Sequence, residues 1–223
     1  MYDIIKRIFD VISSGVAILI FSPLLIPIII GLKLTGEGHI FYRQSRIGYK
    51  NKSFFIWKFA TMLKDSANMP GGIITTKKDP RITPMGTFLR KTKINEMPQL
   101  FNIFFGDMSV VGPRPVMNIS FEAYPESIQK IIYNVKPGLT GIGSIIFRDE
   151  EELLSEMEVK GGNIWDFYKD KIYPFKGELE VWYQEHKSFT LDLKLIFLTV
   201  WVILVPTSKV YEKYLKNLPR RSF

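Results

Sequence analysis

The sequence predicts an α+β fold that is mainly helical: a re-entrant N-terminal membrane helix, then a compact cytosolic domain with a small β element and interfacial helices. Three observations indicate this fold. Residues 11–32 form an uncharged apolar segment, residues 195–205 form a second apolar run, and the region between them is polar, with more helical than strand patterns. We therefore expect residues 1–38 to anchor the chain and residues 39–223 to form the cytosolic domain with membrane-interface helices.

The composition excludes several classes of protein. With 223 residues, 46% of them hydrophobic, the chain has enough apolar surface for a folded core and is not intrinsically disordered. The absence of Cys excludes a disulfide framework, a thiolate zinc site and a cysteine nucleophile. Only two His are present, so any metal would be a hard cation held by oxygen atoms. The net charge of +8 predicts an anionic partner: nucleic acid, an anionic membrane surface or a phosphorylated substrate.

The apolar segment of residues 11–32 is long enough to cross a bilayer, because a helix of this length spans ~33 Å. It is too long for a secretory signal peptide and lacks a small-residue cleavage site. Two features favour a re-entrant hairpin over a spanning helix. Pro23 and Pro27 disturb the helix, and basic residues flank both ends, which predicts that both ends stay cytoplasmic. We expect a bend at Pro23, supported by a hydrogen bond from the Ser22 hydroxyl to the carbonyl of Ile18.

A second apolar helix is expected over residues 191–205, where Pro206 ends it. Thr190 is the expected N-cap, and Asp192 suits the positive end of the helix dipole. Its length of ~22 Å is short for a membrane span. It is either a buried core helix or a helix at the membrane interface, with Trp201 near the headgroups. The basic residues that follow it suit an anionic lipid surface.

The middle of the chain contains a predicted hairpin and several helices. Aromatic strand patterns flank a turn at residues 48–52, and Gly71 and Gly72 open a loop. Residues 112–115 (GPRP) cannot form regular structure, and the glycine-rich segment of residues 138–144 is read as a turn rather than a dinucleotide site. Four helices are expected, over residues 87–93, 97–105, 121–134 and 147–160.

The densest cluster of functional residue types is RKTKINEMPQLFNIFFGDMSVVGPRP, residues 90–115. Each feature alone has an ordinary structural explanation, such as a solvated basic face or a stiff Pro-Arg-Pro turn. Together they suit a site that handles anions, because arginine side chains bind phosphate oxygens in a bidentate manner. The carboxylate of Glu96 could hold Mg²⁺ or attack phosphorus and carry a phosphoryl group. The cluster therefore predicts chemistry on phosphate groups.

This sequence resembles the small bacterial sugar transferases, the monotopic polyprenyl-phosphate phosphoglycosyltransferases. The similarity extends over nearly the whole chain. It is carried by KRIFD, the Ser22-Pro23 pair, FYRQSRIG, KFATM, LRKTKINEMPQLFN, GDMSVVGPRP, KPGLTG and SFTLDLKLIFLTVWVIL. The resemblance implies that residues 39–223 form a catalytic domain on the cytosolic face of the bacterial inner membrane.

The resemblance also implies a reaction and its participants. Such enzymes transfer a sugar-1-phosphate from a UDP-sugar to polyprenyl (undecaprenyl) phosphate, release UMP and require Mg²⁺. The step begins the membrane stage of capsule, O-antigen, exopolysaccharide or glycoprotein glycan synthesis. We accordingly expect UDP-sugar, polyprenyl phosphate and inner-membrane lipids as partners, and no nucleic acid. A homodimer is compatible with the sequence but no motif indicates it, and the transferred sugar is not indicated either.

The family uses an Asp-Glu pair, in which the Asp is the nucleophile and the Glu a Mg²⁺ ligand. This pair corresponds to Asn95 and Glu96 here, which we take as the catalytic candidates, with Glu96 as the metal ligand. Arg90 matches an arginine that contacts substrate phosphate. The other expected substrate-binding residues are Lys58 of KFATM, Pro113 and Arg114 of the Pro-Arg-Pro loop, and Arg148, which aligns less securely.

The sequence departs from the family pattern at two positions. Ala60 stands where the family often has a basic residue, which removes one phosphate contact. Asn95 replaces the nucleophilic Asp, and an amide oxygen is a poor nucleophile toward phosphorus. Three explanations for Asn95 stay open: Glu96 is the nucleophile, polyprenyl phosphate attacks directly, or the chain is inactive. The alternative functions are an inactive scaffold of a glycan-assembly complex and a membrane-anchored nucleic-acid-binding protein.

Overall fold

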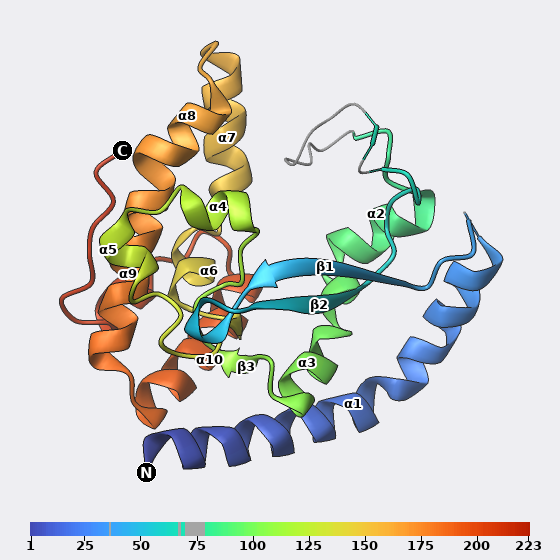
Figure 1. Cartoon of the computed structure of the whole chain (residues 1–223), viewed down its shortest axis with the longest axis horizontal. Helices are drawn as coiled ribbons and strands as arrows, with labels where there is room; N and C mark the ends of the chain where they lie inside the picture. Colours follow the sequence, from blue (N-terminus) through green and yellow to red (C-terminus); the bar gives the residue numbers. More distant parts are fainter. Residues whose placement is uncertain (36, 67, 70–78) are drawn as a thin grey trace. The chain divides into compact units, whose positions relative to one another are not determined.

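The structure is a computed structural model of the whole chain, and it describes residues 1–35, 37–66, 68–69 and 79–223. The described chain forms two compact units. The first comprises Met1–Asp10, Arg46–Phe54 and Gly106–Phe223, and the second comprises Val11–Ser45 and Phe55–Phe105. The mainly helical α+β fold is confirmed (Figure 1). The loop predicted at Gly71 and Gly72 lies outside the described residues.

Helix α1 (Tyr2–Leu34) is continuous through Pro23 and Pro27. Pro23 lacks the N–H that would bond to the carbonyl of Leu19, four residues earlier. That carbonyl instead accepts a hydrogen bond from the Ser22 hydroxyl at 2.8 Å. The predicted acceptor, the carbonyl of Ile18, is therefore wrong by one residue, because the Ser22 hydroxyl donates to the carbonyl that Pro23 leaves without a backbone partner.

Among the described residues, α1 is the one helix that is long and apolar enough to cross a membrane. Most of its apolar side chains are exposed, which indicates association with a membrane. The re-entrant path through the bilayer stays a prediction.

The predicted hairpin is confirmed. Strand β1 (Phe41–Ile47) pairs with β2 (Ser53–Phe59), and the short 3₁₀ segment η1 (Tyr49–Asn51) forms the turn between them. Lys50 and Asn51 adopt left-handed backbone conformations, with φ of 55° and 58°, which reverse the chain within the turn. Phe59 of β2 is buried in a cluster with Leu25, Ile28 and Leu32 of α1 and with Leu89.

Two helices and a 3₁₀ segment complete the second unit. They are α2 (Pro84–Lys91), η2 (Ile94–Glu96) and α3 (Gln99–Phe105). The helices predicted over residues 87–93 and 97–105 are confirmed with shifted ends. Helix α2 begins three residues earlier than predicted, because Thr83 caps it and Pro84 suits its first turn.

The core of the first unit is built on a parallel strand pair that the sequence patterns did not predict. Strand β3 (Ser109–Val111) pairs with β4 (Gly138–Thr140), Ser109 opposite Gly138. Helices α6 (Ile142–Ile146), α9 (Tyr173–His186) and α10 (Phe189–Leu204) contribute Ile142, Leu179 and Leu195 to this core, each of them 0% exposed. Residues 138–144, read as a turn, thus form a strand followed by a helix.

The helix predicted over residues 121–134 is wrong. Two short helices occur here, α4 (Asn118–Glu122) and α5 (Glu126–Gln129), because Pro125 between them lacks a backbone N–H and begins the second helix. The acidic helix is confirmed as α7 (Glu150–Val159). The remaining elements are α8 (Ile164–Phe167), the π-helix η3 (Tyr168–Ile172) and α11 (Tyr211–Tyr214).

Helix α10 begins at Phe189, and the Ser188 hydroxyl accepts the hydrogen bond of the Leu191 N–H, so the expected cap, Thr190, is wrong by two residues. Asp192 accepts hydrogen bonds from Lys6 Nζ at 2.7 Å and from the Tyr183 hydroxyl at 2.7 Å. The buried Lys6–Asp192 ion pair joins the start of α1 to the start of α10. One face of α10 is buried, whereas Phe197, Trp201 and Leu204 on the other face are exposed. The helix is therefore partly core and partly exposed apolar surface.

Candidate active site

The junction between β2 and α2 positions Arg90. The Thr83 N–H donates to the carbonyl of Thr61 at 3.0 Å, and the Thr83 hydroxyl caps the Gly86 N–H at 3.0 Å. A Cβ atom at Gly86 would lie 2.1 Å from the Thr61 carbonyl oxygen, so this close approach requires glycine. Arg90 is one turn further along the same side of the helix. Its Nε donates to the Thr61 hydroxyl at 2.9 Å.

Lys93, in a left-handed conformation, then turns the chain toward Asn95 and Glu96, the predicted catalytic pair. Lys93 follows the end of α2 with φ of 60° and ψ of 8°. This conformation costs a side-chain-bearing residue about 1–2 kcal/mol. The Lys93 N–H donates to the Arg90 carbonyl, and the Glu96 N–H donates to the Lys93 carbonyl, each at 3.1 Å. Asn95 and Glu96 are thereby held in a tight 3₁₀ segment directly after the Arg90 turn.

Lys58 of β2 and Glu96 form an ion pair, with Nζ and Oε1 3.0 Å apart and both side chains largely buried, 17% and 18% exposed. Asn95 is 9% exposed, and its Oδ1 has no hydrogen-bond partner among the described residues. Burial lowers the pKa of Arg90, while the negative charges of Asp79 and Glu96 act in the opposite direction. The site thus combines two cations, one carboxylate and one unpartnered amide oxygen.

Two neighbouring arrangements were not predicted from the sequence. Arg81 binds Asp79 through Nε at 2.8 Å and through Nη2 at 2.5 Å, and these hydrogen bonds lower the pKa of Asp79 to about 2. Asn102 of α3 is 1% exposed and joins the helix to β2. Its Nδ2 donates to the Phe55 carbonyl at 2.8 Å, and its Oδ1 accepts from the Trp57 N–H at 3.0 Å. The motif LFN holds this asparagine, although nothing in the sequence alone shows its partners.

The Pro-Arg-Pro loop of the first unit is fixed from within that unit. The Tyr133 hydroxyl donates to the carbonyl of Arg114 at 2.8 Å and accepts from the Val116 N–H at 3.1 Å. The carbonyl of Pro113 accepts from the Gly138 N–H at 2.9 Å, at the start of β4. Pro113 is buried and Arg114 is exposed. Tyr133 was not predicted, because its hydroxyl and the loop meet only through tertiary packing.

Arg148 stands in the turn between α6 and α7, exposed to solvent. In the same unit, Lys176 forms an ion pair with Glu150 at 2.7 Å and lies over the ring of Phe147, 4.8 Å from its centroid. Burial lowers the pKa of Lys176, Glu150 opposes this, and the positive charge of Arg114 lowers it further. Lys176, which no sequence motif indicated, is therefore close enough to Arg114 for their charges to interact.

The structure thus brings four of the predicted residues together in the second unit: Lys58, Arg90, Asn95 and Glu96. Pro113, Arg114 and Arg148 belong to the first unit.

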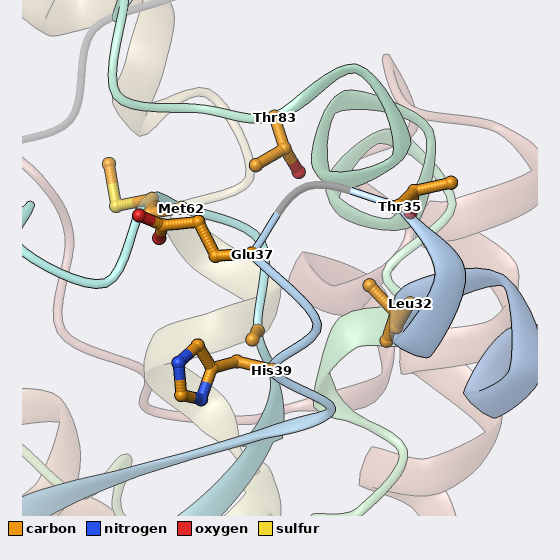
Figure 2. Close-up of a pocket in the computed structure, with 7 residues that line it drawn as sticks. Leu32, Thr35, Glu37, His39, Met62 and Thr83 are labelled. Carbon is orange, nitrogen blue, oxygen red and sulfur yellow. The ribbon is translucent and has the colours of Figure 1, made fainter.

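A small pocket in the second unit is lined by none of the predicted site residues (Figure 2). Leu32 lines it from the last turn of α1, and Thr35, Glu37 and His39 line it from the segment between α1 and β1. Ala60, Met62 and Thr83 complete it. Ala60, the position where the resemblance implied a basic residue, thus forms part of its wall. The loss of a phosphate contact at this position stays a prediction.

Comparison with known proteins identifies the family of this chain. The profile described as "Bacterial sugar transferase" matches residues 1–206. The chain belongs to the bacterial sugar transferase family. The expectation drawn from KFATM, LRKTKINEMPQLFN and the other motifs is confirmed at this level.

Several relatives of this family member have names that state an activity. The chain is 38% identical over 201 residues to the UDP-glucose:undecaprenyl-phosphate glucose-1-phosphate transferase of Klebsiella pneumoniae, covering 89% of the chain and 40% of that protein. It is 32% identical to the undecaprenyl-phosphate galactose phosphotransferase of Salmonella typhimurium, covering 90% and 40%. It is 35% identical to the exopolysaccharide production protein ExoY of Rhizobium meliloti, covering 77% and 82%. The chain thus spans about two fifths of the Klebsiella and Salmonella proteins.

Proposed function

We propose that this chain transfers a sugar-1-phosphate from a UDP-sugar to polyprenyl (undecaprenyl) phosphate and releases UMP. The observation that carries the proposal is the Lys58–Glu96 ion pair beside Arg90, in a chain of the bacterial sugar transferase family. Cations of this kind bind phosphate oxygens, and the partly buried setting strengthens their electrostatic effect. The relatives named after transfers to undecaprenyl phosphate support the same reaction class. Their names state different sugars, so the sugar is left unspecified.

Asn95 determines the route that we propose. Its amide cannot act as the nucleophile, and the neighbouring carboxylate, Glu96, is engaged by Lys58. An oxygen of polyprenyl phosphate therefore attacks the β-phosphorus of the UDP-sugar directly. The bond from that phosphorus to the bridging oxygen breaks, and UMP leaves with the bridging oxygen and its electron pair. Lys58 and Arg90 stabilise the charge that develops on the phosphate oxygens.

The residues of the site fit a magnesium ion. Among the described residues, no group of three or more His, Cys, Asp or Glu is arranged to hold a metal. Mg²⁺, however, is commonly bound through one or two protein oxygen ligands together with substrate phosphates and water. Glu96 would supply the carboxylate, and the buried, unpartnered Oδ1 of Asn95 would supply a second oxygen. When bound, the ion would neutralise charge on the diphosphate.

We further propose that the protein is monotopic on the cytosolic face of the bacterial inner membrane. The exposed apolar side chains of α1 support the membrane part of this proposal, and the basic residues on both sides of the segment support the cytosolic face. Polyprenyl phosphate carries its phosphate at headgroup depth. A shallow anchor would hold Glu96 at this depth and lower the entropic cost of the encounter.

The test is a screen of UDP-sugars for UMP release from full-length protein with polyprenyl phosphate, with and without Mg²⁺. We expect release with at least one UDP-sugar, only when Mg²⁺ and the lipid are present. The Glu96→Gln variant should reduce the rate about 100-fold. Glu178→Gln, which removes an exposed carboxylate on α9, is the matched control and should leave the rate unchanged. A wild-type rate in Glu96→Gln would refute the role of this residue.

Kinetics and Asn95→Asp separate the three explanations for Asn95. Initial rates that require a ternary complex support direct attack. A phosphosugar adduct trapped on Glu96 would refute direct attack and assign Glu96 as the nucleophile. Activity that appears only in Asn95→Asp would show that the natural chain is inactive and favour the scaffold.

A further inference from the structure

One face of the β1–β2 hairpin carries a basic side chain stacked on aromatic rings. The guanidinium carbon of Arg43 lies 4.7 Å from the ring centroid of Phe55 and 5.2 Å from that of Trp57. Phe41 meets Trp57 edge-on, with centroids 5.8 Å apart. Phe41, Arg43 and Phe55 are exposed, and Trp57 is half-buried. We name these four residues the Arg43 face.

Arg43 differs from Lys58 and Arg81 of the same unit in what its side chain contacts. Lys58 pairs with Glu96, and Arg81 pairs with Asp79. Within the part of the chain that the structure describes, the Arg43 side chain has neither a hydrogen bond nor an ion pair. The rings restrict its side chain while the N–H donors stay available, and such a planar cation matches the oxygens of a phosphate group.

The Arg43 face continues toward the membrane helix. Phe41 stacks on Phe59, with centroids 5.5 Å apart, and Phe59 packs in the cluster with Leu25, Ile28 and Leu32 of α1. Exposed aromatic rings next to an apolar helix are typical of membrane interfaces. Helix α3, which Asn102 holds against β2, adds further exposed rings: Phe101, Phe104 and Phe105. Within this unit, Figure 1 shows β1, β2 and α3 on the same side of α1.

A phosphate bound at the Arg43 face would differ from the polyprenyl phosphate that reacts in the proposed function. Alternate residues of a strand point to opposite faces, so Lys58 lies on the face of β2 opposite to Phe55 and Trp57. Lys58 pairs with Glu96, the catalytic carboxylate of the proposed function. A phosphate held by Arg43 would therefore lie on the opposite face of the strand from the Lys58 side chain, so we assign it to a lipid other than the reacting polyprenyl phosphate.

We propose that the Arg43 face binds the phosphate of an anionic bilayer phospholipid, such as phosphatidylglycerol. Phe41, Phe55 and Trp57 would lie at the headgroup level and Arg43 would hold the phosphate. The inference rests on the proposed membrane association of α1, and it assigns the hairpin as a second contact with the bilayer. It accounts for a stacked, exposed arginine beside the apolar helix.

The test uses the natural absence of cysteine in this chain. Full-length Ser45→Cys carries a fluorophore on the strand face of Arg43, and Tyr42→Cys carries it on the opposite face, both residues being exposed. The proteins are reconstituted into vesicles that contain nitroxide-labelled phosphatidylglycerol or nitroxide-labelled phosphatidylcholine. We expect phosphatidylglycerol to quench the label at position 45 more strongly than phosphatidylcholine does, and more strongly than it quenches the label at position 42. Equal quenching at both positions would overturn the proposal.

A matched pair of charge substitutions then tests Arg43 itself. Arg43→Gln should lower the preference for phosphatidylglycerol about fivefold, the effect of one basic residue near an anionic surface. Lys52→Gln removes the same charge from an exposed position of the hairpin and should lower it much less. An unchanged preference in Arg43→Gln would refute the site, and displacement of the labelled lipid by equimolar polyprenyl phosphate would refute the assignment to phospholipid. UMP release is measured separately, so a wild-type chain that prefers phosphatidylglycerol but releases no UMP would refute only the proposed function.

Discussion

Glu180 is a buried carboxyl group whose ionisation should set the pH dependence of stability. It lies on α9 and is 4% exposed, in the core of the first unit. Burial raises its pKa from 4.5 to about 8, while Lys176 and the Gly143 N–H act in the opposite direction. Its Oε2 has no hydrogen-bond partner among the described residues. Glu180→Gln replaces the protonated acid with a neutral group of the same shape.

The sign and size of the effect follow from the two pKa values. The folded pKa lies above the unfolded one, so between pH 4.5 and 8 the folded state keeps a proton that the unfolded state has released. The contribution of Glu180 to the free energy of unfolding therefore falls as pH rises, by ~1.4 kcal/mol per pH unit. Across the whole window the loss amounts to ~5 kcal/mol as an upper bound. Glu180→Gln removes this loss, so the variant should gain stability relative to wild type as pH rises.

The assay is urea denaturation of the full chain in detergent, followed by circular dichroism, at intervals from pH 5 to pH 8.5. The quantity of interest is the difference in unfolding free energy between Glu180→Gln and wild type, which should grow up to about pH 8 and then level off. Glu178→Gln, on the same helix but exposed, should show a difference that does not change with pH. A Glu180→Gln difference that is flat, or that shrinks as pH rises, would show that Glu180 is ionised in the folded protein.

Two further predictions concern a close backbone contact and a buried ion pair. Gly86→Ala places a Cβ 2.1 Å from the Thr61 carbonyl oxygen, so it should lower the free energy of unfolding by about 1–3 kcal/mol and abolish UMP release. The control is Gly15→Ala, whose Cβ meets only the Phe104 ring at 3.4 Å and which should keep the wild-type stability. Thermal denaturation of both variants measures the difference. Lys6→Met leaves the carboxylate of Asp192 buried without its cation and should lower the free energy of unfolding by about 3–5 kcal/mol. Adding Asp192→Leu to Lys6→Met should recover much of the loss, and a double variant as unstable as the single one would contradict this explanation.

The elements that the sequence predicted correctly depend on local interactions. The hairpin around residues 48–52, the helices α2, α3 and α7, and the apolar helix α1 each follow from side-chain periodicity and turn residues within one short segment. Two of the errors are local as well, since Pro125 divides a predicted helix and Ser22 bonds to Leu19 rather than Ile18. In both cases the missing N–H of a proline decided the outcome.

For the candidate site, the sequence by itself determined the residue types and the family, because LRKTKINEMPQLFN and GDMSVVGPRP are contiguous motifs. Only the tertiary structure decided which of these residues meet. Lys58 reaches Glu96 from a strand 38 residues earlier, and Lys6 reaches Asp192 across 186 residues. The burial that raises the pKa of Glu180 also arises from packing between distant segments. Such pairings depend on the free energy of the whole fold, so no local pattern contains them.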